Sequence, residues 1–106
     1  MPYSDYSDEK LVWLFHNEDN QGFAEIYNRY WKKLVGMAIY KTNDRNTAEE
    51  IVQELFVNLW ERRATLLIQN LENYLFVALR YLIIAHLKKT GWHATQSIPK
   101  AWKLRR

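Results

Sequence analysis

The sequence predicts an all-α protein, a compact bundle of about four helices with a basic C-terminal tail. Glycine and proline, which interrupt helices, are rare, with three and two among 106 residues. Apolar residues recur at spacings of three and four, and no segment shows the strict alternation of a half-buried strand. A chain of this length has room for one domain with a single core.

The first two helices are expected to flank a polar turn. The first helix is short and begins after Ser7, whose hydroxyl can cap it. The turn covers residues 16–20 and ends in residues that suit a helix N-cap. A loop rich in Asn and Asp is predicted at 41–46. The apolar stripes of the two helices are Leu11, Val12, Leu14 and Phe15, then Phe23, Ile26, Tyr27, Tyr30, Leu34, Val35 and Ala38.

A third helix is predicted to open with a capping box, Thr47-Ala48-Glu49-Glu50. Arg62 and Arg63 are expected in its last turn, where cations complement the helix dipole. Its inward stripe is Ile51, Val52, Leu55, Phe56, Leu59 and Trp60.

Residues 64–70 break the helical pattern, and a fourth helix is expected from about Leu71 to Lys89. Thr90-Gly91 is a plausible stop signal. Beyond it, residues 92–106 show no clear period and are interpreted as a mobile tail or a weak extra helix. The inward stripe of the fourth helix is Tyr74, Leu75, Ala78, Leu79, Leu82 and Ile83.

Charge is distributed unevenly along the chain, although the net charge is only +3. Residues 1–72 hold all 12 acidic residues beside eight basic ones, a net charge of −4. Residues 73–106 hold seven basic residues and no acidic one, a net charge of +7. Such an end attracts polyanions through phosphate neutralisation and counterion release, although a solvated face or a membrane-surface patch has the same composition.

No pattern of catalytic or metal-binding residues is present. The chain has no cysteine, which excludes disulfides, thiol catalysis and cysteine-based zinc sites. His16, His86 and His93 lack metal-ligand spacing, and no phosphate-binding loop or nucleophile elbow occurs. The sequence therefore predicts a protein that is not an enzyme and has no metal or other cofactor. Without a signal peptide or an apolar run near the ~20 residues of a membrane span, a cytoplasmic location is expected.

The outer face of the predicted third helix is acidic and amide-rich. A solvated helix face is the simplest interpretation of such a row. Beside a basic end, however, it suggests two surfaces for two partners, a cationic protein and a nucleic acid. The residues of this face are Glu50, Gln53, Glu54, Asn58 and Glu61.

Three parts of the chain together resemble region 2 of the extracytoplasmic-function sigma factors. They are Asp8–Val12 with Gly22–Tyr30, then Ala48–Arg63, and then Tyr74–Arg80. The most diagnostic string is Glu-Glu-Ile-Val-Gln-Glu-x-Phe-x-x-Leu-Trp in the second part. Order and spacing match the family over about residues 8–90.

The resemblance implies a domain that binds core RNA polymerase and recognises and melts the −10 promoter element. In this family the helix that matches 47–63 binds the clamp helices of the largest polymerase subunit, with the Gln53-Glu54 pair in the contact. The loop matching 64–70 and the following helix read the −10 element as single-stranded DNA. An anti-sigma factor is a further partner that the resemblance allows. The DNA-binding candidates are Gln69, Asn70, Tyr74, Arg80, Lys88 and Lys89.

The chain departs from the family pattern in several places. Tyr81 stands where many members have Asn, Ala85 where they have Asp, and Tyr74 where they often have Trp, so Tyr74 can stack on a base or pack in the core. The 64–70 loop lacks the usual Pro and Gly. We expect a region 2 domain over 1–90 and a linker or tail over 91–106. The second domain of the family, region 4, is missing, which suggests a fragment or a truncated product.

Two other functions fit the same residues. A helical adaptor or regulator could use the acidic face to hold polymerase or an anti-sigma factor without reading DNA. A membrane-surface protein could use residues 80–106, which would require a larger apolar face in 92–106 than the sequence provides.

Overall fold

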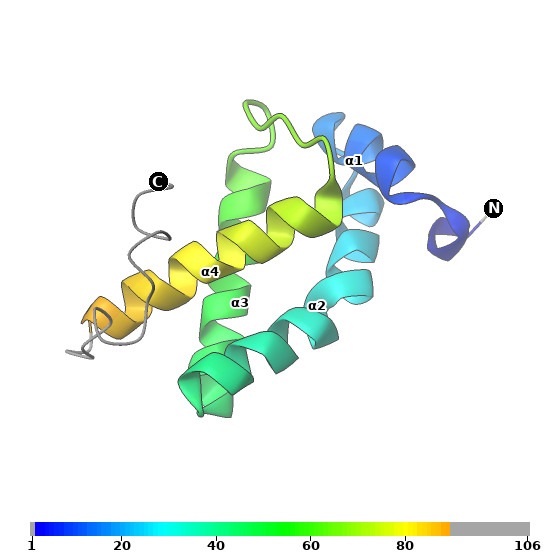
Figure 1. Ribbon diagram of the computed structural model, residues 1–106. Helices are drawn as coiled ribbons and strands as arrows, with labels where there is room; N and C mark the ends of the chain where they lie inside the picture. The colour runs from blue at the N-terminus through cyan, green and yellow to red at the C-terminus, as the bar shows by residue number, and fades with distance from the viewer. Residues whose placement is uncertain (1, 90–106) are drawn as a thin grey trace.

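The computed structural model describes residues 2–89, which form one short 3-10 helix and four α-helices (Figure 1). These are η1 (Tyr3–Asp5), α1 (Asp8–His16), α2 (Asn20–Thr42), α3 (Arg45–Glu61) and α4 (Leu71–Lys89). The all-α prediction is confirmed, and no strand occurs within the described residues. The predicted stop at Thr90-Gly91 and the predicted tail lie outside them.

Helices α2 and α3 run side by side, and α4 crosses both of them (Figure 1). Their buried side chains, with those of α1, form one core that contains no charged residue. Several residues predicted to point inward lie only half-buried at its edge, and all of them except Leu14 flank surface grooves. These are Val12, Leu14, Phe23, Tyr27, Trp60, Tyr74, Ala78 and Leu82.

Caps hold the start of α1 and α2 as the sequence predicts. The Ser7 hydroxyl accepts a hydrogen bond from the Lys10 amide at 3.1 Å. Asp19 caps α2 by accepting from the Gln21 amide at 2.9 Å and the Gly22 amide at 3.2 Å. The Tyr3 hydroxyl donates to the other Asp19 oxygen at 2.8 Å, and this bond lowers the pKa of the Asp19 carboxyl.

The loop predicted at 41–46 is present but shorter, and the prediction that Thr47 opens the third helix with a capping box is wrong. The second helix continues through Thr42 and the third begins at Arg45, so the connection consists only of Asn43 and Asp44. Asn43 adopts a left-handed conformation (φ 60°), and its amide donates to the Ile39 carbonyl, a compact helix ending. Asp44 is the N-cap residue, and the Thr47 hydroxyl inside the first turn donates to its carboxylate at 2.6 Å.

The end of α3 also differs from the prediction. The helix stops at Glu61, so Arg62 is its C-cap residue and Arg63 lies beyond it. The Arg63 guanidinium nevertheless folds back and donates to the Trp60 carbonyl at 2.7 Å. A cation therefore does meet the negative end of the helix dipole, from outside the last turn.

Arg29 joins the N-terminal segment to α2. Its guanidinium contacts the Asp8 carboxylate at 3.0 Å, Glu25 at 3.3 Å and the Ser4 carbonyl at 3.2 Å. The Tyr30 hydroxyl donates to the second Asp8 oxygen, and burial together with this bond raises the pKa of Tyr30. Both η1 and the first turn of α1 are thereby tied to one turn of α2.

Candidate functional site

The acidic row on α3 is exposed and unpaired. Glu50, Gln53, Glu54 and Glu61 all lie on the solvent side of the helix. None of their side chains makes a hydrogen bond or an ion pair with another residue in 2–89. Other carboxylates of the described chain are largely occupied, as in the Asp8 and Asp19 contacts. The row is therefore available to an external cationic partner.

An apolar groove runs along the row, between α2 and α3. Its volume is about 390 Å³, and Gln53 and Glu61 line it together with hydrophobic side chains. The ring centroids of Phe23 and Trp60 are 5.0 Å apart in this wall. Val57, between the acidic residues, is 54% exposed. We call this surface the α3 face, and it consists of Glu50, Gln53, Glu54, Val57 and Glu61 with the groove residues Phe23, Tyr27, Phe56 and Trp60.

Asn58 is separated from the other predicted polymerase-binding residues. It is half-buried and lines a different groove, between α3 and α4, with Leu55, Arg62 and Tyr74. Asn58 follows Glu54 by four residues and precedes Glu61 by three, a spacing that predicts one shared side, yet its side chain borders the groove toward α4 at the edge of that side. The structure brings together four of the five predicted residues, and Asn58 turns toward α4.

The loop before α4 borders a small polar pocket of about 280 Å³. Gln69 and Asn70 form one wall, and the first turn of α1 forms the other with Asp8 and Glu9. Asn70 also caps α4, because its side-chain oxygen accepts from the Asn73 amide at 2.9 Å. Its side-chain NH₂ group keeps its donors for a ligand. The pocket thus offers amide and carboxylate groups in one place.

Arg63 fixes the point where the chain leaves α3 and enters this loop. Its guanidinium carbon lies 4.0 Å from the Trp60 ring centroid, and one nitrogen contacts Glu18 at 3.3 Å. The Arg63 carbonyl is 2.9 Å from Nδ1 of His16. Contacts from α1, from the turn after it and from α3 therefore anchor the loop at its first residues.

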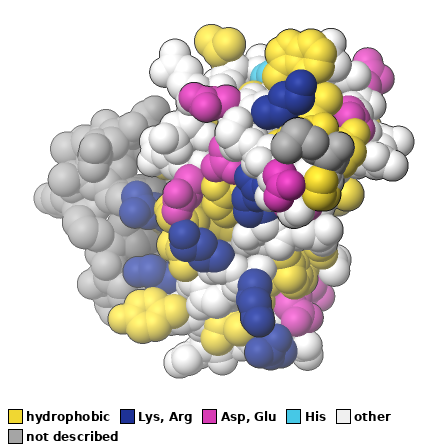
Figure 2. Space-filling model, turned by 90° about the vertical axis from the view of Figure 1, so that its right-hand side faces the viewer, with side chains coloured by type: hydrophobic (Ala, Val, Ile, Leu, Met, Phe, Trp, Pro, Cys, Tyr) yellow, Lys and Arg dark blue, Asp and Glu magenta, His cyan; other side chains and the backbone are white. Residues whose placement is uncertain are grey.

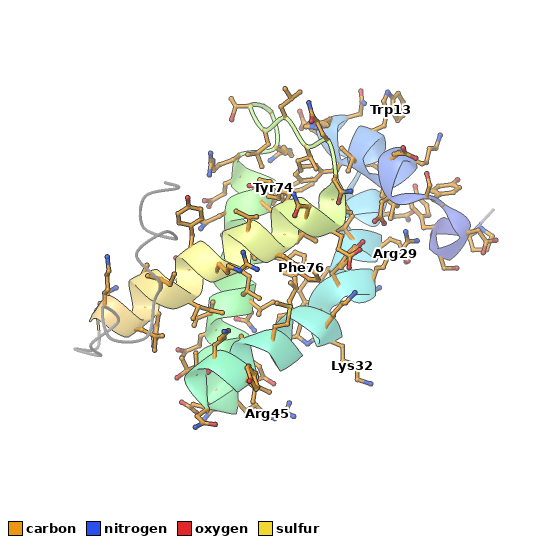
Figure 3. The ribbon with its side chains drawn as sticks, viewed as in Figure 1. Trp13, Arg29, Lys32, Arg45, Tyr74 and Phe76 are labelled. Atoms are coloured by element: carbon orange, nitrogen blue, oxygen red, sulfur yellow. The ribbon has the colours of Figure 1, made fainter. Side chains whose placement is uncertain are left out.

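The candidate DNA residues on α4 point to different sides of the helix. Tyr74 is half-buried in the α3–α4 groove with Leu66, whereas Phe76 lies on the side facing α2 (Figure 3). Arg80 follows Phe76 by one turn and is exposed, as are Lys88 and Lys89 at the end of the helix. These residues extend over about 27 Å from Asn70 to Lys88, at 1.5 Å per residue. They form a track along α4 and not a single pocket.

Sequence reasoning missed two groups of residues. Phe23, Tyr27 and Val57 border the α3 groove, yet periodicity alone assigned the two aromatic residues to the core. Asp8 and Glu9 come from a helix distant in sequence and wall the loop pocket. Their only signal was membership in the first segment that resembles the sigma-factor family.

Within residues 2–89, no helix is long and apolar enough to cross a membrane. The same residues contain no cluster of His, Asp and Glu side chains placed to hold a metal ion.

The fold and its surfaces define a small helical domain with two contrasting faces, one acidic and partly apolar, the other polar and basic. A family model described as Sigma-70 region 2 matches residues 26–93, more than half of the chain. The chain therefore belongs to the sigma-70 region 2 family, the transcription-factor domain by which sigma factors bind core RNA polymerase and recognise the −10 element. Searches of curated proteins and of solved structures gave no match.

Proposed function

We propose that this chain is the region 2 domain of an extracytoplasmic-function sigma factor. It binds the clamp helices of core RNA polymerase through the α3 face, and it reads the −10 element as single-stranded DNA through the loop pocket and α4. The observation that carries the proposal is the row of unpaired carboxylates beside an aromatic groove. The match to the family covers this row, the loop and α4.

The chemistry of the α3 face suits a protein partner. Protein interfaces combine an apolar centre with a polar rim, and aromatic side chains are enriched in that centre. Phe23 and Trp60 supply the apolar part, and Gln53, Glu54 and Glu61 supply the rim. Carboxylates form strong, often bidentate bonds with arginine. We therefore expect arginine side chains of the partner to meet Glu54 and its neighbours.

The chemistry of the loop pocket suits an unpaired base. A base outside the duplex stack is read through hydrogen bonds to its edge. Carboxylates accept from the amino group of cytosine, and amide side chains can both donate and accept. Glu9, Gln69 and Asn70 offer these groups around the pocket, whereas both Asp8 oxygens are occupied by Arg29 and Tyr30. Arg80, Lys88 and Lys89 are exposed cations along α4 that can contact phosphates.

The experiment is a titration of labelled chain against core RNA polymerase. Reversing Gln53→Lys and Glu54→Lys together should weaken binding by about 2–5 kcal/mol if the contact is desolvated. Asp5→Lys with Gln21→Lys makes the same change of charge on η1 and α2 and should leave the affinity unaltered. Wild-type affinity of the α3 variant, with helicity preserved, would refute the assignment of the α3 face.

A helical adaptor that holds polymerase without reading DNA is the second candidate, because the α3 face alone would serve it. Binding of single-stranded −10 variants separates the two functions. Selection among these variants that changes in Gln69→Ala supports the sigma-factor function. Equal affinity for every strand, in wild type and variant, supports the adaptor.

A further inference from the structure

A stripe of residues along α2 belongs to neither of the two surfaces described so far. Its members are spaced by three or four residues, so they share one side of the helix. Residues 26–43 contain no acidic residue. Figure 2, which views the molecule from the α2 side, shows Lys and Arg side chains spread over this surface. The α2 stripe is Arg29, Lys32, Lys33, Gly36 and Tyr40.

Two of its three cations are available to a ligand. Arg29 is occupied by Asp8, Glu25 and backbone carbonyls, as described above. Lys32 is exposed and forms no ion pair with a residue in 2–89. Lys33 contacts Glu72 at 2.8 Å, but the side chains are 56% and 45% exposed. Such an exposed pair is weak and exchanges readily for a stronger anion.

Gly36 lies in the middle of the stripe and leaves the helix backbone open. Glycine disfavours a helix interior, and packing does not require it here, because nothing lies within 4 Å of a Cβ added at this position. Lys32 and Tyr40 lie one turn before and one turn after it. The Tyr40 side chain is 82% exposed. An extended polyanion can therefore approach α2 closely between two polar side chains.

The stripe lies beside the helix that we propose to read the −10 element. Lys33 contacts Glu72 in the first turn of α4, and its ammonium lies 5.4 Å from the Phe76 ring centroid. Arg80 continues the row of Glu72 and Phe76 at a spacing of four, so it lies on the same side of α4. Figure 3 shows Lys32 and Phe76 on this side of the molecule.

We propose that the α2 stripe, with Arg80, binds the phosphodiester backbone of promoter DNA next to the −10 element. The proposal rests on the proposed DNA-binding function of α4. Charge complementarity carries it, because Lys32 has no carboxylate partner within residues 2–89 and Lys33 has only the exposed Glu72, so both lysines can attract phosphates and release counterions. With one exposed aromatic residue and no amide, the stripe offers little for base readout. Its contribution to DNA affinity is therefore independent of sequence.

The test measures fluorescence anisotropy of the full chain with a labelled mixed-sequence DNA that has a duplex part and a single-stranded overhang. Lys32→Gln with Lys33→Gln should lower affinity about tenfold at low salt and reduce the salt slope by about two. Gly36→Gln should weaken binding severalfold without a change of charge. Lys10→Gln on α1 is the matched control for Lys32→Gln alone. Circular dichroism verifies that each variant is folded.

Repeating the measurement with the overhang strand alone locates the backbone that is bound. A loss confined to the DNA with a duplex part assigns the stripe to duplex phosphates, and an equal loss on both probes assigns it to the single strand. Wild-type affinity and salt slope in the lysine variants would overturn the proposal while leaving α4 and the loop as DNA readers. Binding of the wild-type chain to anionic phospholipid vesicles, with none to either DNA, would overturn it together with the DNA part of the proposed function.

Discussion

At Gly22 a hydrogen in place of a side chain lets α1 and α2 meet. A Cβ added there would lie 2.9 Å from the Cβ of Leu14, closer than carbon atoms in a folded protein approach. Gly36 on the same helix has open space around it. The sequence does not distinguish the two glycines, because both fall within a helical pattern.

Substitution by alanine should therefore act in opposite directions at the two positions. Gly22→Ala should reduce the free energy of unfolding by about 1–3 kcal/mol, since α1 must move to relieve the overlap. Gly36→Ala should increase it by about 0.5–1 kcal/mol, the helix-propensity difference. Urea denaturation followed by circular dichroism measures both. A stabilised Gly22→Ala would show that α1 and α2 are not packed as described.

Asp19 makes the free energy of unfolding depend on pH in the acidic range. The Tyr3 hydrogen bond lowers the pKa of Asp19 below its ordinary value of 3.8. A carboxyl whose pKa falls on folding contributes stability above its unfolded pKa and loses it as the pH falls through the folded pKa. Between about pH 5 and pH 2, Asp19→Asn should show a shallower loss of unfolding free energy than wild type. Asp5→Asn is the control, and equal slopes for wild type and Asp19→Asn would contradict the role of Asp19.

At the scale of elements, the number and type of helices follow from the sequence better than their ends. The start predicted for α4 from periodicity and the 64–70 break agrees with the structure, and its predicted end falls on the last residue that the structure describes. The start of α3 was misplaced because Thr47 and Glu50 satisfy the capping-box pattern, whereas Asp44 caps the helix one turn earlier. Asn and Asp between 41 and 46 suggested a loop, but a left-handed Asn43 closes the turn in two residues. Local patterns do not reveal which of two adjacent caps is used.

Arg63 connects α1, the turn after it and α3, although these elements are separated in the sequence. Arg63→Ala removes the contacts with Trp60 and Glu18, and it should reduce the free energy of unfolding by about 1–3 kcal/mol. It should also speed hydrogen exchange in residues 64–70, because the loop loses its first anchor. Arg62→Ala, one residue away and exposed, is the matched control and should change neither quantity. Unaltered exchange in Arg63→Ala would show that the loop is held by its other contacts.

At the scale of the molecule, the net charge of a sequence segment does not show how its charges are distributed over the folded surface. Residues 1–72 are acidic in sum, yet the carboxylates of the N-terminal part are largely paired and those of α3 gather on one face. The cations of α2 are left on another face, beside α4. The sequence predicted two surfaces of opposite charge, but the contribution of α2 to the basic one depends on packing between distant helices.

The central claim is that the α3 face meets polymerase while the loop and α4 meet DNA. Val57 and Val77 allow a matched test, because both are exposed valines, on α3 and on α4. A photo-crosslinking phenylalanine analogue replaces one or the other in the full chain, which is then irradiated with core polymerase and a −10 DNA strand. The analogue at position 57 should crosslink to the largest polymerase subunit, and the analogue at position 77 should not. Crosslinking of position 57 to DNA, or of position 77 to the largest subunit in its place, would contradict the assignment of the two faces.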